Sequence, residues 1–205
     1  MSNIETLESR RLLSIAVHGA TMHIVGTEGN DIISFDSVQT GTITPEVRYY
    51  NNFAYLNGRG FKFDPSEIHK IVVDSKGGDD RIQLPKFLVS SVIHKYGNGP
   101  DAYTQFSVRA AVNAGNGNDV IVGGRLSDTL NGGDGNDQIF GGDGNDLLNG
   151  GNGNDMLNGG NGNDSLIGEQ GRDTIIGGAG TDSANIDSKD IVDSLTLENR
   201  TIAPG

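Results

Sequence analysis

Residues 132–167 read GGDGNDQIF, GGDGNDLLN, GGNGNDMLN and GGNGNDSLI, four units of nine residues without a gap. The same period runs from residue 114 to residue 185, which makes eight consecutive units. We number the positions of a unit from place one, its first glycine, to place nine. Repetition at a fixed short period is typical of a solenoid, in which each unit packs against its neighbours in sequence.

Two places of the unit hold the same kind of residue throughout. Place six is always aspartate: Asp119, Asp128, Asp137, Asp146, Asp155, Asp164, Asp173 and Asp182. Place eight is always apolar: Ile121, Leu130, Ile139, Leu148, Leu157, Leu166, Ile175 and Ala184. A disordered Gly/Asn/Asp-rich linker needs no periodic apolar residue, so the array is expected to have a core. Fragments such as Gly133-Asp134-Gly135 half-match the dinucleotide-binding G-x-G-x-x-G, but no long helix pattern follows them.

The chemistry of the unit predicts a flattened coil. Glycines at places one, two and four permit positive φ, so the first six residues can turn tightly. The last three form a short strand whose middle side chain faces the core. Two units then make one coil of 18 residues with two turns. Stacking the coils places one set of aspartates along a first edge and the other set along a second edge. The first edge holds Asp119, Asp137, Asp155 and Asp173, and the second edge holds Asp128, Asp146, Asp164 and Asp182.

Stacked carboxylates need positive charge between them. Adjacent coils lie about 4.8 Å apart, so carboxylates in the same column repel one another unless a cation intervenes. Aspartate and backbone carbonyl oxygens are hard ligands, which suit calcium better than zinc or copper. The charge follows the array: residues 114–185 carry 11 acidic and 2 basic side chains, a balance of −9 out of −12 for the whole chain.

The array resembles the RTX nonapeptide repeats of hemolysin-type calcium-binding proteins, whose pattern is GGxGxD followed by x, an apolar residue and x. The resemblance implies a parallel β-roll that holds calcium between the loops of successive coils. It implies that same-edge aspartates share an ion with backbone carbonyls of the Gly-rich hexamers. The implied pairs are Asp119/Asp137, Asp137/Asp155, Asp155/Asp173, Asp128/Asp146, Asp146/Asp164 and Asp164/Asp182, up to about six ions in the regular roll. The implied hexamer glycines are Gly115, Gly117, Gly133, Gly135, Gly142, Gly144, Gly151, Gly153, Gly160 and Gly162.

Three departures from the pattern affect particular turns. Leu126 stands where place four should be glycine, and because leucine resists positive φ the loop that ends at Asp128 is expected to be distorted. Glu169 replaces a glycine in the seventh unit, either as a ligand or as a weakness of that turn. Ala184 underfills the last apolar place, as expected where a core tapers.

Residues 20–113 contain echoes of the unit, and we expect an irregular, β-helix-like part of the same solenoid there. The echoes place Asp31, Asp80 and Asp101 at turns, without showing whether they bind metal. Strand patterns occupy residues 21–25, 32–35, 42–50 and 67–73, and Asn57-Gly58 predicts a tight hairpin turn. Most aromatic residues lie here, which indicates a thicker core. The fold class is therefore all-β, a parallel β-roll preceded by less regular coils.

The two ends differ from the solenoid. Ser2 and Glu5 have capping-box spacing, which fits a short helix through Leu13 in a segment of residues 1–19. Residues 7–13, LESRRLL, also resemble the LExRxLL motif of many planctomycete surface and secreted proteins, for which an export or surface role is implied. A capped surface helix is an equal interpretation. At the other end, residues 186–205 leave the period and are expected to cap the array of residues 114–185.

Composition limits the classes of function. Hydrophobic residues make up 34% of the chain and tryptophan is absent, so metal is expected to supply part of the folding free energy. Cysteine is absent. The acidity of the chain argues against nucleic acid as a partner. No apolar run approaches the ~20 residues of a membrane span. The four histidines form no HExxH pair and no G-x-S-x-G elbow occurs. We expect a non-enzymatic, secreted or surface-displayed calcium-binding monomer. A structural or adhesive surface spacer is the alternative, and the non-catalytic part of a secreted hydrolase or toxin is a more distant one.

Overall fold

The computed structural model describes residues 14–44, 47–63, 68–85, 88–89, 92–94, 105–193 and 197–202. The regular structure in these ranges consists of strands, and no part of them forms a helix that could cross a membrane. The predicted helix through Leu13 and the LESRRLL motif lie outside the described residues, as does Asp101.

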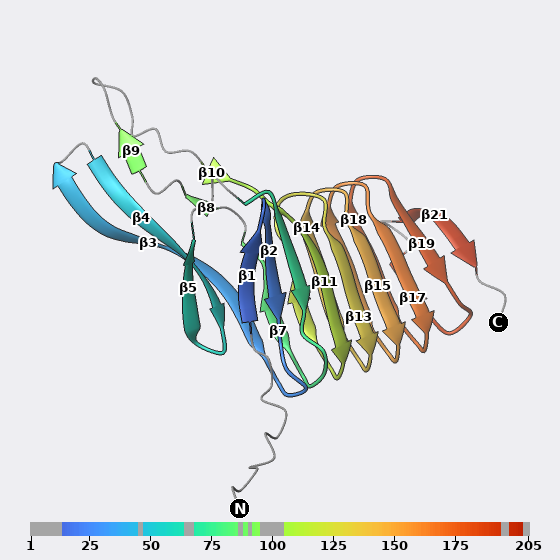
Figure 1. Ribbon diagram of the computed structural model, residues 1–205. Helices are drawn as coiled ribbons and strands as arrows, with labels where there is room; N and C mark the ends of the chain where they lie inside the picture. The colour runs from blue at the N-terminus through green and yellow to red at the C-terminus, as the bar shows by residue number, and fades with distance from the viewer. Residues whose placement is uncertain are drawn as a thin grey trace, which may run out of the picture.

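Most strands belong to two large sheets that face each other across a narrow core (Figure 1). The first, sheet A, has the order β1-β2-β6-β11-β13-β15-β17-β19-β21. Its strands are β1 (Ser14–His18), β2 (Thr21–Val25), β6 (Lys70–Asp74), β11 (Arg109–Asn116), β13 (Thr129–Asp134), β15 (Leu147–Asn152), β17 (Ser165–Gln170), β19 (Asp182–Ile186) and β21 (Leu197–Ile202).

The second, sheet B, has the order β20-β18-β16-β14-β12-β7-β3-β4-β5, with β9 also paired to β4. Its strands are β3 (Ile32–Thr44), β4 (Val47–Leu56), β5 (Arg59–Phe63), β7 (Arg81–Gln83), β9 (Val92–His94), β12 (Val120–Val122), β14 (Gln138–Asp143), β16 (Met156–Asn161), β18 (Thr174–Ala179) and β20 (Ile191–Val192). A separate pair joins β8 (Leu88–Val89) and β10 (Gln105–Phe106).

The chain alternates between the two sheets, and each pair of strands is one coil. Within the array the pairing is parallel and joins residues 18 apart, for example Leu130 with Leu148 and Ile139 with Leu157. The predicted coil of two units is therefore confirmed, and so is the all-β parallel β-roll. The first-edge aspartates all precede strands of sheet B, and the second-edge aspartates precede or begin strands of sheet A.

The strands of the array are longer than the sequence predicts. We expected a six-residue turn and a three-residue strand, but β13 to β18 each span six residues, from place seven to place three of the next unit. The pairing passes through the glycines, as between Gly133 and Gly151. Glycine permits this because neighbouring coils approach too closely for a side chain: a Cβ on Gly133 would lie 2.0 Å from the Gly115 carbonyl oxygen. The turn proper is thus only places four to six.

The less regular half is an extension of the same roll, as predicted. Strands β2 and β3 form its first coil and β6 and β7 its second, with parallel pairing from β2 to β6 and from β3 to β7. A long β-hairpin formed by β3 and β4 projects from the first coil, and β8 to β10, which follow the second coil in the chain and precede β11, lie toward this hairpin (Figure 1). The tight turn at Asn57-Gly58 is confirmed by positive φ values of 51° and 77° between β4 and β5.

One predicted strand is wrong. Residues 42–50 were expected to form a continuous strand, but β3 ends at Thr44 and β4 begins at Val47, and the two run antiparallel. Pro45 lies between them in the sequence, and proline supplies no N–H to a strand ladder, which disfavours a continuous strand through this point.

The core is narrow in the array and broader before it. In the array the place-eight side chains of the two sheets are buried, and Ile121, Leu130, Ile139 and Leu148 are fully inaccessible. In the first coils the core contains Met22, Ile24, Ile33, Leu56 and other apolar side chains, and Ile15, Val17 and Phe35 pack against it. Of the aromatic side chains on which the expectation of a thicker core rested, Phe35 packs against this core and Phe61 is exposed.

Strands outside the regular period lie at both ends of the roll. Strand β1 pairs antiparallel with β2, so sheet A starts inside the segment that we assigned to residues 1–19. At the other end β21 pairs with β19 after a register shift at Asp182 and Ser183, and β20 pairs with β18. These terminal strands form hydrogen bonds with backbone N–H and C=O groups that would otherwise be unpaired at the edges of the regular coils.

Candidate metal centre

The first-edge aspartates form a hydrogen-bonded ladder. Each backbone N–H donates to Oδ1 of the aspartate one coil further on, from Asp119 to Asp137 at 2.8 Å and from Asp137 to Asp155 at 2.8 Å. The next step, from Asp155 to Asp173, is 2.9 Å. The ladder places the carboxyl groups in one column, as the 18-residue coil predicts.

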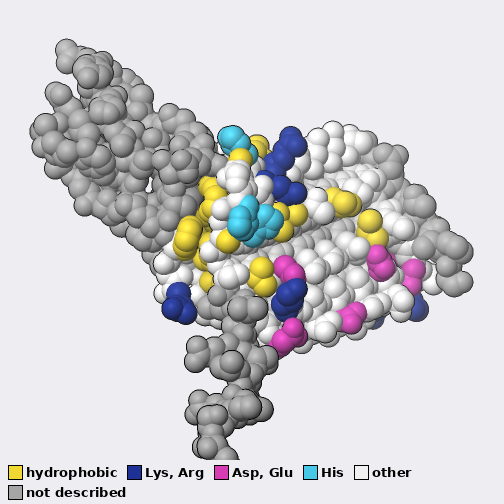
Figure 2. Space-filling model, in the orientation of Figure 1, with side chains coloured by type: hydrophobic (Ala, Val, Ile, Leu, Met, Phe, Trp, Pro, Cys, Tyr) yellow, Lys and Arg dark blue, Asp and Glu magenta, His cyan; other side chains and the backbone are white. Residues whose placement is uncertain are grey.

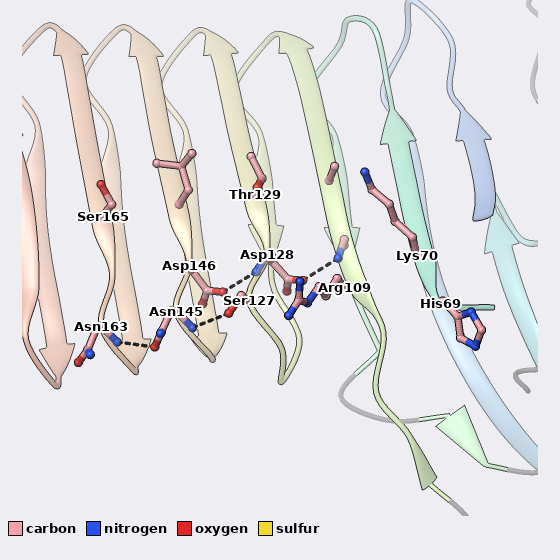
Figure 3. Close-up of a pocket in the computed structure, with 13 residues that line it drawn as sticks. His69, Lys70, Arg109, Ser127, Asp128, Thr129, Asn145, Asp146, Asn163 and Ser165 are labelled. Carbon is pink, nitrogen blue, oxygen red and sulfur yellow. Dashed lines mark hydrogen bonds between the residues drawn. The ribbon is translucent and has the colours of Figure 1, made fainter. Parts of the chain in front are cut away.

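The second edge has the same ladder, part of which is drawn in Figure 3. The N–H of Asp128 donates to Asp146 Oδ1 at 2.7 Å, and that of Asp146 donates to Asp164 at 2.8 Å. Asp164 continues to Asp182 at 2.8 Å. A groove of about 690 Å³ runs beside these turns, with His69, Lys70 and Arg109 at one end. The carboxyl groups themselves lie beneath the surface.

Every ladder aspartate of the array is buried, with at most 3% of its surface exposed. Figure 2 accordingly shows few acidic side chains over the regular coils of the visible face, although this part of the chain is the most acidic. Oδ2 has no hydrogen-bond partner in Asp80, Asp119, Asp137, Asp146, Asp155, Asp164, Asp173 and Asp182. A buried carboxylate oxygen without a partner is costly, and a cation is the usual way to compensate for it.

The backbone at place two decides whether Oδ2 has a partner. In the two turns where place two does not have a positive φ, its N–H donates to Oδ2: Thr27 to Asp31 at 2.6 Å and Gly124 to Asp128 at 2.8 Å. In the turns where φ at place two is positive, Oδ2 is unpartnered. These place-two residues are Lys76, Gly115, Gly133, Gly142, Gly151, Gly160, Glu169 and Gly178. We call the first kind of turn closed and the second kind open.

Burial is the main cause of raised pKa values in the ladder. It raises the pKa of Asp137 and Asp146 to about 7 and that of Asp155 to about 6. Backbone hydrogen bonds to Oδ1 lower these pKa values, and neighbouring ladder carboxylates raise them. For the same first cause the pKa values of four more carboxyls lie above the usual range: Asp119, Asp128, Asp164 and Asp173. The metal-free site thus holds negative charge only at a cost.

Backbone carbonyls supply further oxygen atoms between the turns. A Cβ on Gly135 would lie 1.8 Å from the Gly117 carbonyl oxygen, and one on Gly153 would lie 1.7 Å from that of Gly135. The place-two carbonyls are arranged likewise: a Cβ on Gly151 would lie 2.1 Å from the Gly133 carbonyl oxygen. No three His, Asp or Glu side chains in the described ranges converge as a metal cluster. The available donor set is therefore carboxylate and carbonyl oxygen, which fits calcium.

A second ladder was not predicted. The place-five side chains accept from the backbone of the next coil: Asn136 N–H donates to Asn118 Oδ1 at 2.8 Å and Asn154 N–H to Asn136 Oδ1 at 2.7 Å. The second edge repeats this, with Asn163 N–H donating to Asn145 Oδ1 at 2.9 Å. The recurrence of Asn at place five was the available sequence signal. Together the two ladders fix successive turns in register.

The sequence also missed Asp190. The N–H of Asp173 donates to Asp190 Oδ1 at 3.1 Å, so Asp190 continues the first edge beyond the array. Its Oδ2 accepts from the N–H of Asp187 at 2.6 Å. The spacing from Asp173 is 17 residues, not 18, which hid the relationship.

The turns with unusual residues behave differently from one another. The Leu126 turn is distorted as predicted: β12 stops at Val122 and Gly124 closes onto Asp128. Glu169 adopts a φ of 68°, and its exposed side chain accepts from Asn149 Nδ2 at 3.0 Å.

The rings of His18 and His23 lie 5.8 Å apart on β1 and β2.

Comparison with known proteins agrees with this geometry. The family model of the RTX calcium-binding nonapeptide repeat, which spans four copies of the repeat, matches residues 113–148, 122–157 and 149–184. The array thus matches the RTX repeat over these residues. The match covers the open turns from Asp119 to Asp182 and leaves the coils before β11 outside it. No curated protein and no solved structure matches the chain.

Proposed function

We propose that this protein binds several calcium ions between successive turns of its β-roll and that calcium drives or stabilises the fold. The observation that carries the proposal is the buried, unpartnered Oδ2 at every open turn. The residues that would hold calcium are the place-six aspartates and the carbonyls of the hexamer glycines, in the same-edge pairs given above. Asp128 is the weakest of these ligands, because Gly124 already donates to its Oδ2.

Calcium would supply charge neutralisation and cross-linking of neighbouring coils. The ladder hydrogen bonds fix the oxygen atoms before binding, so the chain orients the ligands and the cation offsets their repulsion. Extracellular calcium modules work at about 10⁻⁴ to 10⁻³ M, a range that suits sites built from few carboxylates each. We therefore propose a role outside the cell, in a secreted or surface-displayed protein.

The alternative of an adhesive surface spacer gains no specific support. Adhesion through apolar or aromatic ladders on the coil faces would require aligned exposed side chains. Among the residues whose side chains the structure describes, which leaves out most of the β3–β4 hairpin, the exposed large hydrophobic side chains are Ile32, Phe61, Leu147 and Ile191. They lie on different strands and form no such ladder.

Equilibrium dialysis of the full chain against calcium tests the proposal. We expect several ions per chain at millimolar calcium and little competition from equimolar magnesium, which demands stricter octahedral geometry. Asp137→Asn should lower the number of bound ions, and Asp134→Asn, an exposed charge change in the same unit, should not. A chain that binds no calcium under these conditions would overturn the proposal.

A further inference from the structure

The turn before β7 has the construction of the array turns, although it lies outside the matched repeats. Residues 75–83, SKGGDDRIQ, align with the nine places, with Lys76 at place two, Gly78 at place four, Asp80 at place six and Ile82 at place eight. Asp80 is 39 residues before Asp119, because the segment with β8 to β10 intervenes. The sequence spacing therefore conceals that the two turns are stacked.

The hydrogen bonds of this turn are those of the array. Asp80 N–H donates to Asp119 Oδ1 at 2.7 Å, which is one step of the place-six ladder. Asn118 N–H donates to Asp79 Oδ1 at 2.8 Å, which is one step of the place-five ladder. Gly78 N–H donates to the Asn116 carbonyl at 2.7 Å, just as Gly117 N–H donates to that of Asp134.

The turn is also open. Lys76 has a φ of 80°, a conformation that side chains other than glycine rarely adopt, and Asp80 Oδ2 has no partner although only 1% of the residue is exposed. The Lys76 ammonium pairs with Asp74 and therefore does not neutralise Asp80. The Ser75 hydroxyl lies near the Asp80 carboxyl and lowers its pKa, but it donates its hydrogen bond to the Ala114 carbonyl at 3.2 Å.

Backbone carbonyls lie between this turn and the next, and that of Lys76 also accepts from Asn116 N–H at 3.0 Å. A Cβ on Gly115 would lie 1.8 Å from the Lys76 carbonyl oxygen, and one on Gly117 would lie 2.0 Å from the Gly78 carbonyl oxygen. In the array the corresponding atoms are the carbonyls of Gly115 and Gly117 beneath Gly133 and Gly135.

We propose that residues 75–80 and 114–119 form an additional calcium site, with Asp80 and Asp119 as its carboxylate ligands and the Lys76 and Gly78 carbonyls beside them. The inference rests on the proposed function of the roll and extends it to a coil outside the repeats. The first edge then carries four sites in a row, from Asp80 to Asp173.

The coil before it marks the end of this row. Asp31 N–H donates to Asp80 Oδ1 at 2.7 Å, so Asp31 belongs to the ladder, but its turn is closed. Its Oδ2 accepts from Thr27 N–H, and its Oδ1 accepts from the Asn57 side-chain amide at 2.6 Å. Thr27 N–H thus supplies the Oδ2 donor that the open turns lack, and the Asn57 amide adds a donor to Oδ1, so we place no ion between Asp31 and Asp80.

Calcium stoichiometry of the unmodified chain and four full-length variants tests the site by dialysis against calcium alone. Asp80→Asn keeps the Oδ1 that accepts from Asp31 but loses the charged Oδ2, so we expect one ion fewer than in the unmodified chain. Asp119→Asn should lose two ions, because Asp119 also pairs with Asp137. The double variant should lose two, since both changes remove the shared site. Asp79→Asn, the same charge change on the neighbouring exposed residue, should lose none.

The outcomes separate the two proposals. If the unmodified chain binds no calcium, the proposed function fails and this site fails with it. If the unmodified chain binds calcium and Asp80→Asn binds equally many ions, only the additional site is overturned. Equal losses in Asp79→Asn and Asp80→Asn would show a general charge effect and also overturn it. Should Asp80→Asn fail to fold, a loss of one ion in Asp119→Asn would contradict the site and a loss of two would support it.

Discussion

The repeated aspartate has two different oxygen atoms. Oδ1 is part of a backbone-to-side-chain ladder that needs no metal, as between Asp137 and Asp155. Oδ2 is buried without a partner at the open turns. One side chain therefore both orders the turns and creates the need for a cation, which explains why aspartate at this place suits the roll better than asparagine or glutamate.

Position within an edge determines how many ions an aspartate serves. Asp155 has two same-edge neighbours, Asp137 and Asp173, whereas Asp182 has one, Asp164. Asp155→Ala should therefore lose about twice as many calcium ions as Asp182→Ala. Asp155→Ala should also destabilise the roll more, because it interrupts the stack in the middle. Calorimetric titration measures both. Equal losses in the two variants would refute shared ligands, though not calcium binding itself.

The raised pKa values predict how the metal-free chain responds to pH. Asp137 and Asp146 have a folded pKa of about 7 against 3.8 for an ordinary carboxyl. Between these values the folded chain binds more protons than the unfolded chain, so stability in chelator should fall as pH rises from about 4 to 7. Circular dichroism in chelator measures this. A metal-free chain that gains β-structure as the pH rises through this range would contradict the assignment.

At the scale of the strand and turn, glycine at place two allows the open conformation without strain. Gly133, Gly151 and Gly160 have φ values of 117°, 106° and 104°. Glu169 takes a similar conformation at 68° despite its side chain. The turn geometry is imposed by pairing with neighbouring coils, because Glu169 is held in register with Gly151.

Glu169→Gly should therefore stabilise the calcium-loaded protein by about 1 kcal/mol, since a non-glycine residue in this region costs about that much. The loss of the exposed hydrogen bond to Asn149 offsets only part of the gain. Gly160→Ala should act in the opposite direction, because its Cβ would lie 2.2 Å from the Gly142 carbonyl oxygen. Thermal melting in saturating calcium measures both variants. A lower melting temperature for Glu169→Gly would indicate that its carboxylate is a ligand.

Much of the array could be predicted from its sequence, because the same few interactions recur every nine residues. Aspartate at place six and an apolar residue at place eight were enough to give the coil and the two edges. The length of the strands was missed, because glycines usually indicate turns and here they also let paired backbones approach closely. The echo of the unit predicted a turn at Asp80, but its stacking on Asp119 and the role of Asp190 emerged only in the structure, since spacings of 39 and 17 residues conceal membership of an 18-residue ladder.

At the scale of the whole molecule, the two halves share one pair of sheets. Strand β6 pairs with β11 and β7 pairs with β12, so the early coils provide the surface on which the array stacks. Strand β1 and the hairpin of β4 and β5 lie before the first coil of the roll, and β20 and β21 lie after its last. A continuous ladder of backbone-to-aspartate hydrogen bonds thus connects the early coils with the end of the array.

A fragment of residues 1–113 should consequently not fold alone. Ending the chain there removes β12 and part of β11, and it leaves Asp80 without the turn of residues 114–119. We expect no cooperative melting transition from this fragment in chelator. A cooperative transition there would show an independent domain and would reopen the question of a separate activity in this half.

The central claim is that calcium neutralises the buried carboxylate columns and that the roll depends on it. Far-UV circular dichroism of the full chain at neutral pH, recorded in chelator and in excess calcium, tests this most directly. We predict little β-structure in chelator and a large gain on adding calcium, because unpartnered carboxylates oppose stacking of the coils. Equal, well-folded spectra under both conditions would contradict the claim.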